Sequence, residues 1–205
     1  MNIVFYCAPN SSAVPVASLL QELQVPHDAV TLDLSKGDQK KPAFLALNPN
    51  GKVPTLVVDG RPMFEAVAIM PWLGERFGVE KKLWPAAEDP ARLDALSWSA
   101  WSYVSLGGSV QRFNIASSSM APKELHHAPI AAAAKQEIEG YFAMLDARLS
   151  KQKYMLGDSF SVLDIIVGSM VLWATMCGLQ VSSHPALNAW VEQLKARPSI
   201  RAQWQ

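Results

Sequence analysis

Two positions where a helix starts carry the residues that could do chemistry. Glu65 and Ala66 begin a helix directly after a strand, and helix N-termini bind anions through free amide groups and the helix dipole. Ser11 and Ser12 lie in the turn between the first strand and the first helix, where a serine hydroxyl can cap the helix. The residue types favour an anionic ligand group near Glu65, and a hydroxyl near Ser11 that is either functional or only a cap.

Several other kinds of site are not expected. No set of His, Cys, Asp and Glu residues has the spacing of metal ligands, and neither a glycine-rich phosphate loop nor a serine-hydrolase elbow occurs. Cys7 and Cys177 are too far apart for a disulfide framework and are expected to be core thiols. The 18 basic residues balance the 18 acidic ones, which gives no electrostatic reason to expect nucleic acid or an anionic membrane as a partner.

The first part of the chain alternates strands and helices. An apolar run over 3–6 predicts a strand, a helix follows and ends before Pro26, and 27–34 suit a second strand, so this βαβ unit should pair its strands in parallel. The remaining expected elements are a short helix over 40–47, strands over 53–58 and 61–64 joined by an Asp59-Gly60 hairpin turn, and a helix over 65–77.

The second part is helical in pattern. The expected elements are a linker over 78–89 and helices over 90–113, with a bend at Gly107-Gly108, 122–149, 161–179 and 185–196. Ser161 and Asp164 form a capping-box pattern before the most apolar helix. The predicted fold class is α/β plus all-α, with a first domain over 1–77, the linker 78–89, and a helical domain over 90–205.

Location is inferred from signals that the sequence lacks. The N-terminus has neither the basic segment nor the long apolar run of a signal peptide. The most apolar stretch, residues 165–179, is shorter than the ~20 residues that a bilayer span requires. We therefore expect a cytoplasmic protein with no membrane partner.

Several motifs occur together along the chain. They are Asn48-Pro49-Asn50-Gly51-Lys52-Val53-Pro54-Thr55-Leu56, Phe64-Glu65-Ala66-Val67-Ala68-Ile69, the Ser161 and Asp164 box, and the closing His184-Pro185, Trp190 and Ala196-Arg197-Pro198. In this order and spacing they resemble the cytosolic glutathione S-transferase family, in its bacterial, serine-type form, over essentially the whole chain. The resemblance implies a thioredoxin-like N-terminal domain (βαβαββα) joined to an all-helical C-terminal domain, in agreement with the predicted elements.

The resemblance also implies a glutathione-binding set of Lys52, Val53, Pro54, Glu65 and Ala66. Pro54 would follow a cis peptide bond, so that the main chain of Val53 pairs with the cysteinyl part of glutathione like an added strand. Glu65 would bind the γ-glutamyl ammonium, and Lys52 the glycyl carboxylate. The family usually has serine at the position of Ala66, so the affinity for glutathione is expected to be roughly 10- to 150-fold weaker, with the amide groups of the helix start still available.

The thiol-activating residue is expected in the turn Tyr6-Cys7-Ala8-Pro9-Asn10-Ser11-Ser12. Serine-type transferases have a Tyr-x-x-Pro-Gly-Ser pattern there, which makes Ser11 the catalytic position. Ser12 matches the cysteine of some bacterial members, and Tyr6 would be a tyrosine-type assignment. The serine hydroxyl would donate a hydrogen bond to the glutathione sulfur and favour the thiolate. The choice between Ser11 and Ser12 stays open, because a one-residue slip of the alignment exchanges them.

The pocket for the electrophile is expected between the domains, beside the long helix that starts at residue 90. Its candidate wall residues are Trp101, Tyr103, Leu106 and Arg112. Aromatic residues at helical spacing can equally belong to a core or a dimer interface. The implied function is that of a homodimeric glutathione transferase that uses glutathione as co-substrate, without a metal, on small hydrophobic electrophiles, as in detoxification.

Two alternative functions stay open. A non-catalytic binding or interaction module is favoured by Ala66 and by Val67, which stands where a positive residue is often found in the family. A glutathione-dependent isomerase or disulfide reductase would use the same scaffold.

Overall fold

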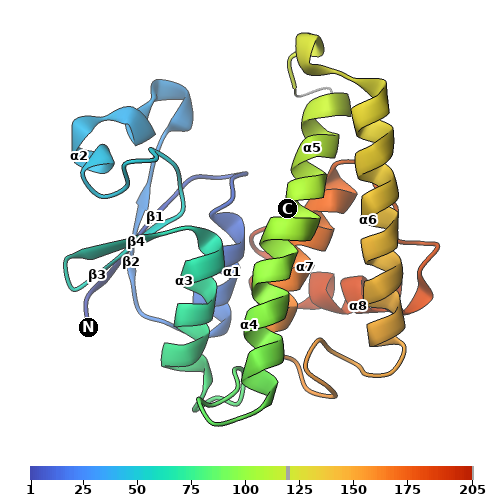
Figure 1. Cartoon of the computed structure of the whole chain (residues 1–205). Helices are drawn as coiled ribbons and strands as arrows, with labels where there is room; N and C mark the ends of the chain where they lie inside the picture. The colour runs from blue at the N-terminus through green and yellow to red at the C-terminus, as the bar shows by residue number, and fades with distance from the viewer. Residues whose placement is uncertain (119–120, 205) are drawn as a thin grey trace. The chain divides into compact units, whose positions relative to one another are not determined.

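The computed structural model describes residues 1–118 and 121–204, and its elements follow the predicted order (Figure 1). In the first part they are β1 (Ile3–Cys7), α1 (Val14–Glu22), β2 (Asp28–Thr31), the 3₁₀ turns η1 (Leu34–Lys36) and η2 (Asp38–Lys40), α2 (Pro42–Leu45), β3 (Thr55–Val58), β4 (Arg61–Phe64), α3 (Ala66–Leu73) and the π-helical turn η3 (Gly74–Gly78). The helix expected over 40–47 is shorter because Lys41 precedes a proline and is extended, a conformation that the following proline ring favours.

The four strands form one mixed sheet in the order β2-β1-β3-β4. β1 pairs with β2 in parallel and with β3 antiparallel, and β3 pairs with β4 as a hairpin. Asp59 and Gly60 both have positive φ, 47° and 81°, as a two-residue hairpin turn of type I′ requires. The predicted parallel βαβ unit and the predicted hairpin are therefore both confirmed.

Helices α1 and α3 pack beside each other on one face of this sheet (Figure 1). Their inward faces bring Leu19, Leu20 and Ile69 into a core with Phe5 and Leu56 from the sheet, and each of these side chains is at most 1% exposed. Burial of five large apolar side chains stabilises the unit by about 1.5–3 kcal/mol for each. This core fixes the start of α1, which follows the turn with the two serines, and the start of α3, which follows Glu65.

In the residues that the structure describes, the elements of the second part are helices and helical turns. They are α4 (Ala91–Trp101), the π-helical turn η4 (Ser102–Leu106), α5 (Gly107–Ser117), the 3₁₀ turn η5 (Lys123–Leu125), α6 (Ala128–Leu149), α7 (Val162–Met176), α8 (Pro185–Ala196) and α9 (Pro198–Arg201). Helix α8 has the predicted bounds. Helix α6 starts later than expected because His127 is extended and accepts the Ile130 amide proton at its Nδ1 atom, 3.3 Å away. Among the described helices, none has both the length and the apolar character needed to cross a bilayer.

The long helix from residue 90 is interrupted one turn before the expected glycines. Its hydrogen-bonding pattern widens at Ser102–Leu106 and returns to α-helix at Gly107. A Cβ atom on Gly107 would lie 3.0 Å from the sulfur of Met170 in α7. Gly107 therefore permits close packing of two helices, while the interruption itself is a π-turn, as often seen within α-helices.

Helix α7 is the centre of the helical unit, and the predicted capping box at its start is present. Asp164 is fully buried and accepts four hydrogen bonds, from the Met155 amide, the Trp190 indole, and both the amide and the hydroxyl of Ser161, at 2.8–2.9 Å. One carboxylate thus joins the loop before α7, the start of α7 and helix α8.

The chain divides into two compact units, one made of residues 1–86 together with the segment from 196 on, the other of residues 87–195. The domains predicted from the sequence, 1–77 and 90–205, placed this C-terminal segment in the helical domain instead. Helix α9 packs against α1. The Arg197 guanidinium pairs with the Glu22 carboxylate, Ser199 donates a hydrogen bond to the same carboxylate at 2.5 Å, and Ile200 is 2% exposed. Contacts this distant in sequence leave no local pattern.

Replacing the central carboxylate should destabilise the helical unit. We expect Asp164→Ala to lower the free energy of unfolding by about 3 kcal/mol or more, because it leaves several buried donors without an acceptor. Thermal and urea unfolding followed by circular dichroism measure the loss. The control is Asp158→Ala, a nearby exposed aspartate, which should change stability by less than about 0.5 kcal/mol. Equal stability of the two variants would contradict the role of Asp164.

Candidate functional site

The turn before α1 holds its two serines in different environments. Ser11 is half-buried, donates its hydroxyl proton to the Ala8 carbonyl at 2.6 Å and accepts the Ala13 amide proton at 3.2 Å. Its hydroxyl therefore closes the turn, as a helix-start serine commonly does. Donation from Ser11 to a ligand would first require this local bond to break.

Ser12 is exposed and makes a long-range contact instead. Its hydroxyl donates a 2.8 Å hydrogen bond to the main-chain carbonyl of Val53, 41 residues away. The peptide bond between Val53 and Pro54 is cis, as expected from the resemblance. The structure thus brings one predicted catalytic residue, Ser12, to two predicted binding residues.

The main chain around Val53 is held by a residue to which the sequence assigned no role. Asn48 is 2% exposed, and its side-chain amide donates to the Lys52 carbonyl at 2.8 Å and to the Thr55 hydroxyl at 3.0 Å. Within the residues that the structure describes, the Val53 amide has no acceptor. The signal that could have found Asn48 is the turn-forming sequence Asn48-Pro49-Asn50-Gly51, in which a buried asparagine can hold the loop.

The pairing of β3 with β4 places Glu65 and Ala66 next to this loop. Thr55 pairs with Phe64 across β3 and β4, so the residues just outside the strands, Pro54 and Glu65, are neighbours. Glu65 is exposed, precedes α3 and has φ 69°, ψ 114°, a conformation that non-glycine residues rarely adopt. Ala66 is 4% exposed and begins the helix. Its amide and that of Val67 are available to an anion, whereas the next amide, of Ala68, already donates to the Glu65 carbonyl at 2.9 Å.

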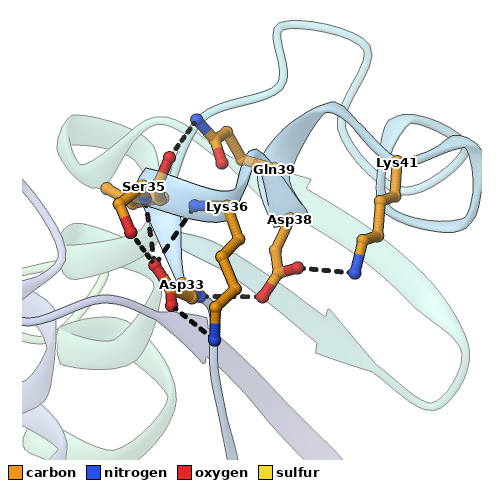
Figure 2. A network of polar contacts seen from close by, with 7 residues as sticks. Asp33, Ser35, Lys36, Asp38, Gln39 and Lys41 are labelled. Carbon is orange, nitrogen blue, oxygen red and sulfur yellow. Dashed lines mark hydrogen bonds and ion pairs between the residues drawn. The ribbon is translucent and has the colours of Figure 1, made fainter.

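A hollow of about 390 Å³ lies beside the turn before α1, where the parallel strands β1 and β2 end. It is lined by Ala8, Pro9, Thr31, Leu32, Asp33 and Leu34. Ligands of open α/β sheets commonly bind at the carboxyl ends of parallel strands. The segment that follows Asp33 forms the polar network of Figure 2. The sequence pattern did not single out the hollow, and of this network it offered only Gln39 and Lys41, together with Lys40, as weaker candidates than Lys52 for the glycyl carboxylate of glutathione.

The predicted wall residues of the electrophile pocket all belong to the helical unit. Trp101 packs edge-on against Trp98 and Tyr141, with ring centroids 4.9 and 5.4 Å apart. Leu106 has no exposed surface, so it is a core residue in this structure, and its predicted role as a wall residue is not supported. Tyr103 is half-buried.

Arg112, the fourth predicted wall residue, has fixed partners on the helical unit. It pairs with Glu137 and donates to the Ser109 hydroxyl at 3.0 Å. The Ser109 hydroxyl also donates a hydrogen bond to the Glu137 carboxylate at 2.8 Å. This bond, and next to it the bond from Arg112, hold the pKa of Glu137 below its usual range. Arg112 is therefore neutralised by a carboxylate on the neighbouring helix.

In the described part of the chain, no group of three or more His, Cys, Asp and Glu residues is placed so that it could hold a metal ion. Cys7 and Cys177 are free thiols. Burial raises the pKa of the Cys177 thiol, which makes it a poorer nucleophile at neutral pH.

Comparison with known proteins decides the family. The chain matches the family model described as glutathione S-transferase, N-terminal domain, over residues 12–76, and that described as glutathione S-transferase, C-terminal domain, over residues 110–198. It is 34% identical over 185 residues to glutathione S-transferase GstB of Escherichia coli K12, a match that covers 89% of this chain and 87% of that protein. This chain belongs to the glutathione S-transferase family.

Two further proteins are similar to this glutathione S-transferase over nearly its whole length. The disulfide-bond oxidoreductase YfcG of Escherichia coli K12 is 28% identical over 207 residues, covering 96% of this chain and 92% of that protein. The crystal structure of the theta class glutathione S-transferase from Xanthomonas axonopodis pv. citri with glutathione bound is 26% identical, with a TM-score of 0.85, covering 99% of this chain and 97% of that one. The family and the fold class implied by the motifs are thereby confirmed.

Proposed function

We propose that this protein is a glutathione transferase that activates the glutathione thiol for attack on small hydrophobic electrophiles, with Ser12 as the activating hydroxyl. The observation that carries the proposal is the hydrogen bond from Ser12 to the Val53 carbonyl. It holds a hydroxyl beside the main chain at which the cysteinyl part of glutathione is expected. The family membership and the glutathione bound in the Xanthomonas relative support the choice of ligand.

Glutathione would be held mainly by main-chain groups. The amide and carbonyl of Val53 pair with the cysteinyl residue as an added strand does. The γ-glutamyl carboxylate lies at the start of α3, where the amide groups and the helix dipole attract an anion, and its ammonium pairs with Glu65. Lys52, which is exposed beside Val53, meets the glycyl carboxylate.

Ser12 is the better candidate than Ser11 because its present bond can be exchanged. When the cysteinyl amide of glutathione donates to the Val53 carbonyl, the Ser12 hydroxyl is released to donate to the sulfur. The carbonyl keeps a partner throughout, so the exchange leaves no buried acceptor unpaired. Ser11 has no such substitute for its bond to Ala8.

The chemistry requires only a modest shift in the thiol pKa. Lowering a thiol pKa by about two units from ~8.5 corresponds to about 2.7 kcal/mol, and one hydrogen bond to a charged group contributes about 1.5–3 kcal/mol. The thiol proton passes to solvent, the thiolate forms a bond to the electrophilic carbon, and the leaving group departs with its electron pair. No metal is needed for these steps.

Homodimerisation and a cytoplasmic location are part of the proposal. Leu93 and Val104, both on the helical segment α4–η4, are 71% and 74% exposed, and an interface between two copies of the chain would cover these large apolar side chains. The free thiols Cys7 and Cys177 suit the reducing cytoplasm, in which disulfides are rare.

Glutathione should bind measurably, and a serine at position 66 should improve binding. We expect Ala66→Ser to tighten glutathione roughly tenfold, because it restores one hydrogen bond to the γ-glutamyl carboxylate. Isothermal calorimetry measures both proteins, with Ala68→Ser, at an exposed position of the same helix, as the matched control. Absence of heat from the wild type at millimolar glutathione would overturn the proposed function.

The Ser12 hydroxyl should control the thiol pKa. Ser12→Ala is expected to lower kcat/KM for conjugation of a nitroaromatic electrophile by roughly 100-fold near neutral pH and to move the pH–rate profile upward by about two units. Ser11→Ala, made alongside, should mainly lower the melting temperature, since it opens the turn. Activity retained by Ser12→Ala and lost in Ser11→Ala would assign the role to Ser11 instead.

The exposed face of α4–η4 should govern assembly. Leu93→Glu combined with Val104→Glu is expected to convert a dimer into a monomer in size-exclusion chromatography with light scattering, because each charge would be buried without a partner. Leu125→Glu, at a 52% exposed leucine on η5, is the control and should leave the mass unchanged. A wild-type monomer would refute the proposed dimer.

A further inference from the structure

The segment between β2 and α2 is closed by two aspartates (Figure 2). Asp33 accepts hydrogen bonds from the Ser35 amide at 3.0 Å, the Ser35 hydroxyl at 2.6 Å and the Lys36 amide at 3.3 Å, and so caps η1. Gly37, with φ 73°, turns the chain between η1 and η2. The Asp33 amide then donates to the Asp38 carboxylate at 2.9 Å, which ties the two ends of the turn together.

Asp38 uses its two carboxylate oxygens separately. One accepts the Asp33 amide, and the other pairs with the Lys41 ammonium at 2.6 Å. These two contacts, that with Lys41 the larger, hold the pKa of Asp38 below its usual range, so the carboxylate is charged at neutral pH. The Asp38 side chain is 22% exposed whereas that of Lys41 is 66% exposed, which makes Asp38 the inner member of the pair.

This closed segment lies directly against the loop that precedes Val53. Gly51 has φ 59°, and a Cβ atom there would lie 2.8 Å from the Gln39 carbonyl oxygen and 2.9 Å from the Lys40 ammonium nitrogen. A non-glycine side chain would clash with main-chain atoms at the first of these distances. The position of the Gln39 carbonyl therefore limits where Gly51, and with it the Lys52–Val53 main chain, can lie.

We propose that Asp38 is a positioning residue for glutathione: by closing segment 33–41 it holds the Gln39 main chain against Gly51 and thereby sets the main chain of Val53. The proposal rests on the proposed function, because Val53 is the expected contact of the cysteinyl part of glutathione. Asp38 itself does not touch the thiol, so it acts on binding rather than on the chemical step.

The test is the effect of Asp38→Asn on glutathione binding and on turnover. The neutral amide loses the ion pair with Lys41 and weakens the closure onto Asp33. We expect the dissociation constant and the KM for glutathione to rise roughly five- to tenfold, with kcat changed less than about twofold and the pH–rate profile unmoved. Lys36→Gln is the matched control, since it removes a different ion pair of the same segment, that with Asp33 at 3.3 Å, and leaves the main-chain bonds in place.

A double-mutant cycle with Gly51→Ala tests the route of the effect. Gly51→Ala should raise the KM for glutathione in the same way, and adding Asp38→Asn to it should have little further effect, because both changes act on one contact. Melting temperatures of all variants identify any that fail to fold, and an intact Gly51→Ala variant then carries the test alone.

The outcomes separate this inference from the proposed function. If the wild type does not bind glutathione, both are overturned. If the wild type binds and Asp38→Asn binds equally well, lowers kcat alone, or binds more tightly, only the inference is overturned. Tighter binding would mean that Lys41, once released, contacts glutathione directly.

Discussion

Two successive carbonyl groups, those of Lys52 and Val53, turn toward the protein, and a buried carbonyl left unpaired is costly. The Asn48 side chain supplies the donor for Lys52, and the Ser12 hydroxyl supplies that for Val53. Together these bonds tie the loop before β3 to the turn before α1. The loop and the turn are the two parts that a thiol ligand would have to contact at once. The proposed roles of Val53 and Ser12 in glutathione binding therefore depend on this junction between segments that are distant in sequence.

In the helical unit a buried carboxyl group, that of Asp164, likewise needs hydrogen-bond partners. Burial raises the pKa of Asp164, and hydrogen bonds from Met155, Trp190 and Ser161 oppose the rise. Since the net shift is upward, the folded protein binds this proton more readily than the unfolded chain does. The contribution of Asp164 to stability thus becomes less favourable as the pH rises through the folded-state pKa and more favourable as the pH falls. The group persists because its four donors would otherwise be unpaired in a dry core.

Features encoded by neighbouring residues could be predicted from the sequence. The Asp59-Gly60 hairpin, the bounds of α8 and the capping box at Ser161 depend on turn chemistry or helical spacing within a few residues. The π-turn at Ser102–Leu106 and the return of the C-terminal segment to α1 depend on packing between distant segments, which leaves no local pattern. The sequence left the choice between Ser11 and Ser12 open, because the contact that favours Ser12 joins residues 41 positions apart and also leaves no local pattern. The proposed wall residues depend on how a pocket forms, and Leu106 shows that helical spacing does not distinguish wall from core.

The proposed recognition of glutathione through main-chain groups would allow unusual side chains at the candidate site. Val53 offers an amide and a carbonyl, which any residue at that position would provide, and Ala66 still offers a helix-start amide although it lacks the hydroxyl usual in the family. The geometry of the main chain then matters more than the identity of the residues that form it. Groups that set this geometry from outside the site, such as the Asp38 carboxylate through the contact at Gly51, should consequently affect affinity as strongly as a residue that touches the ligand.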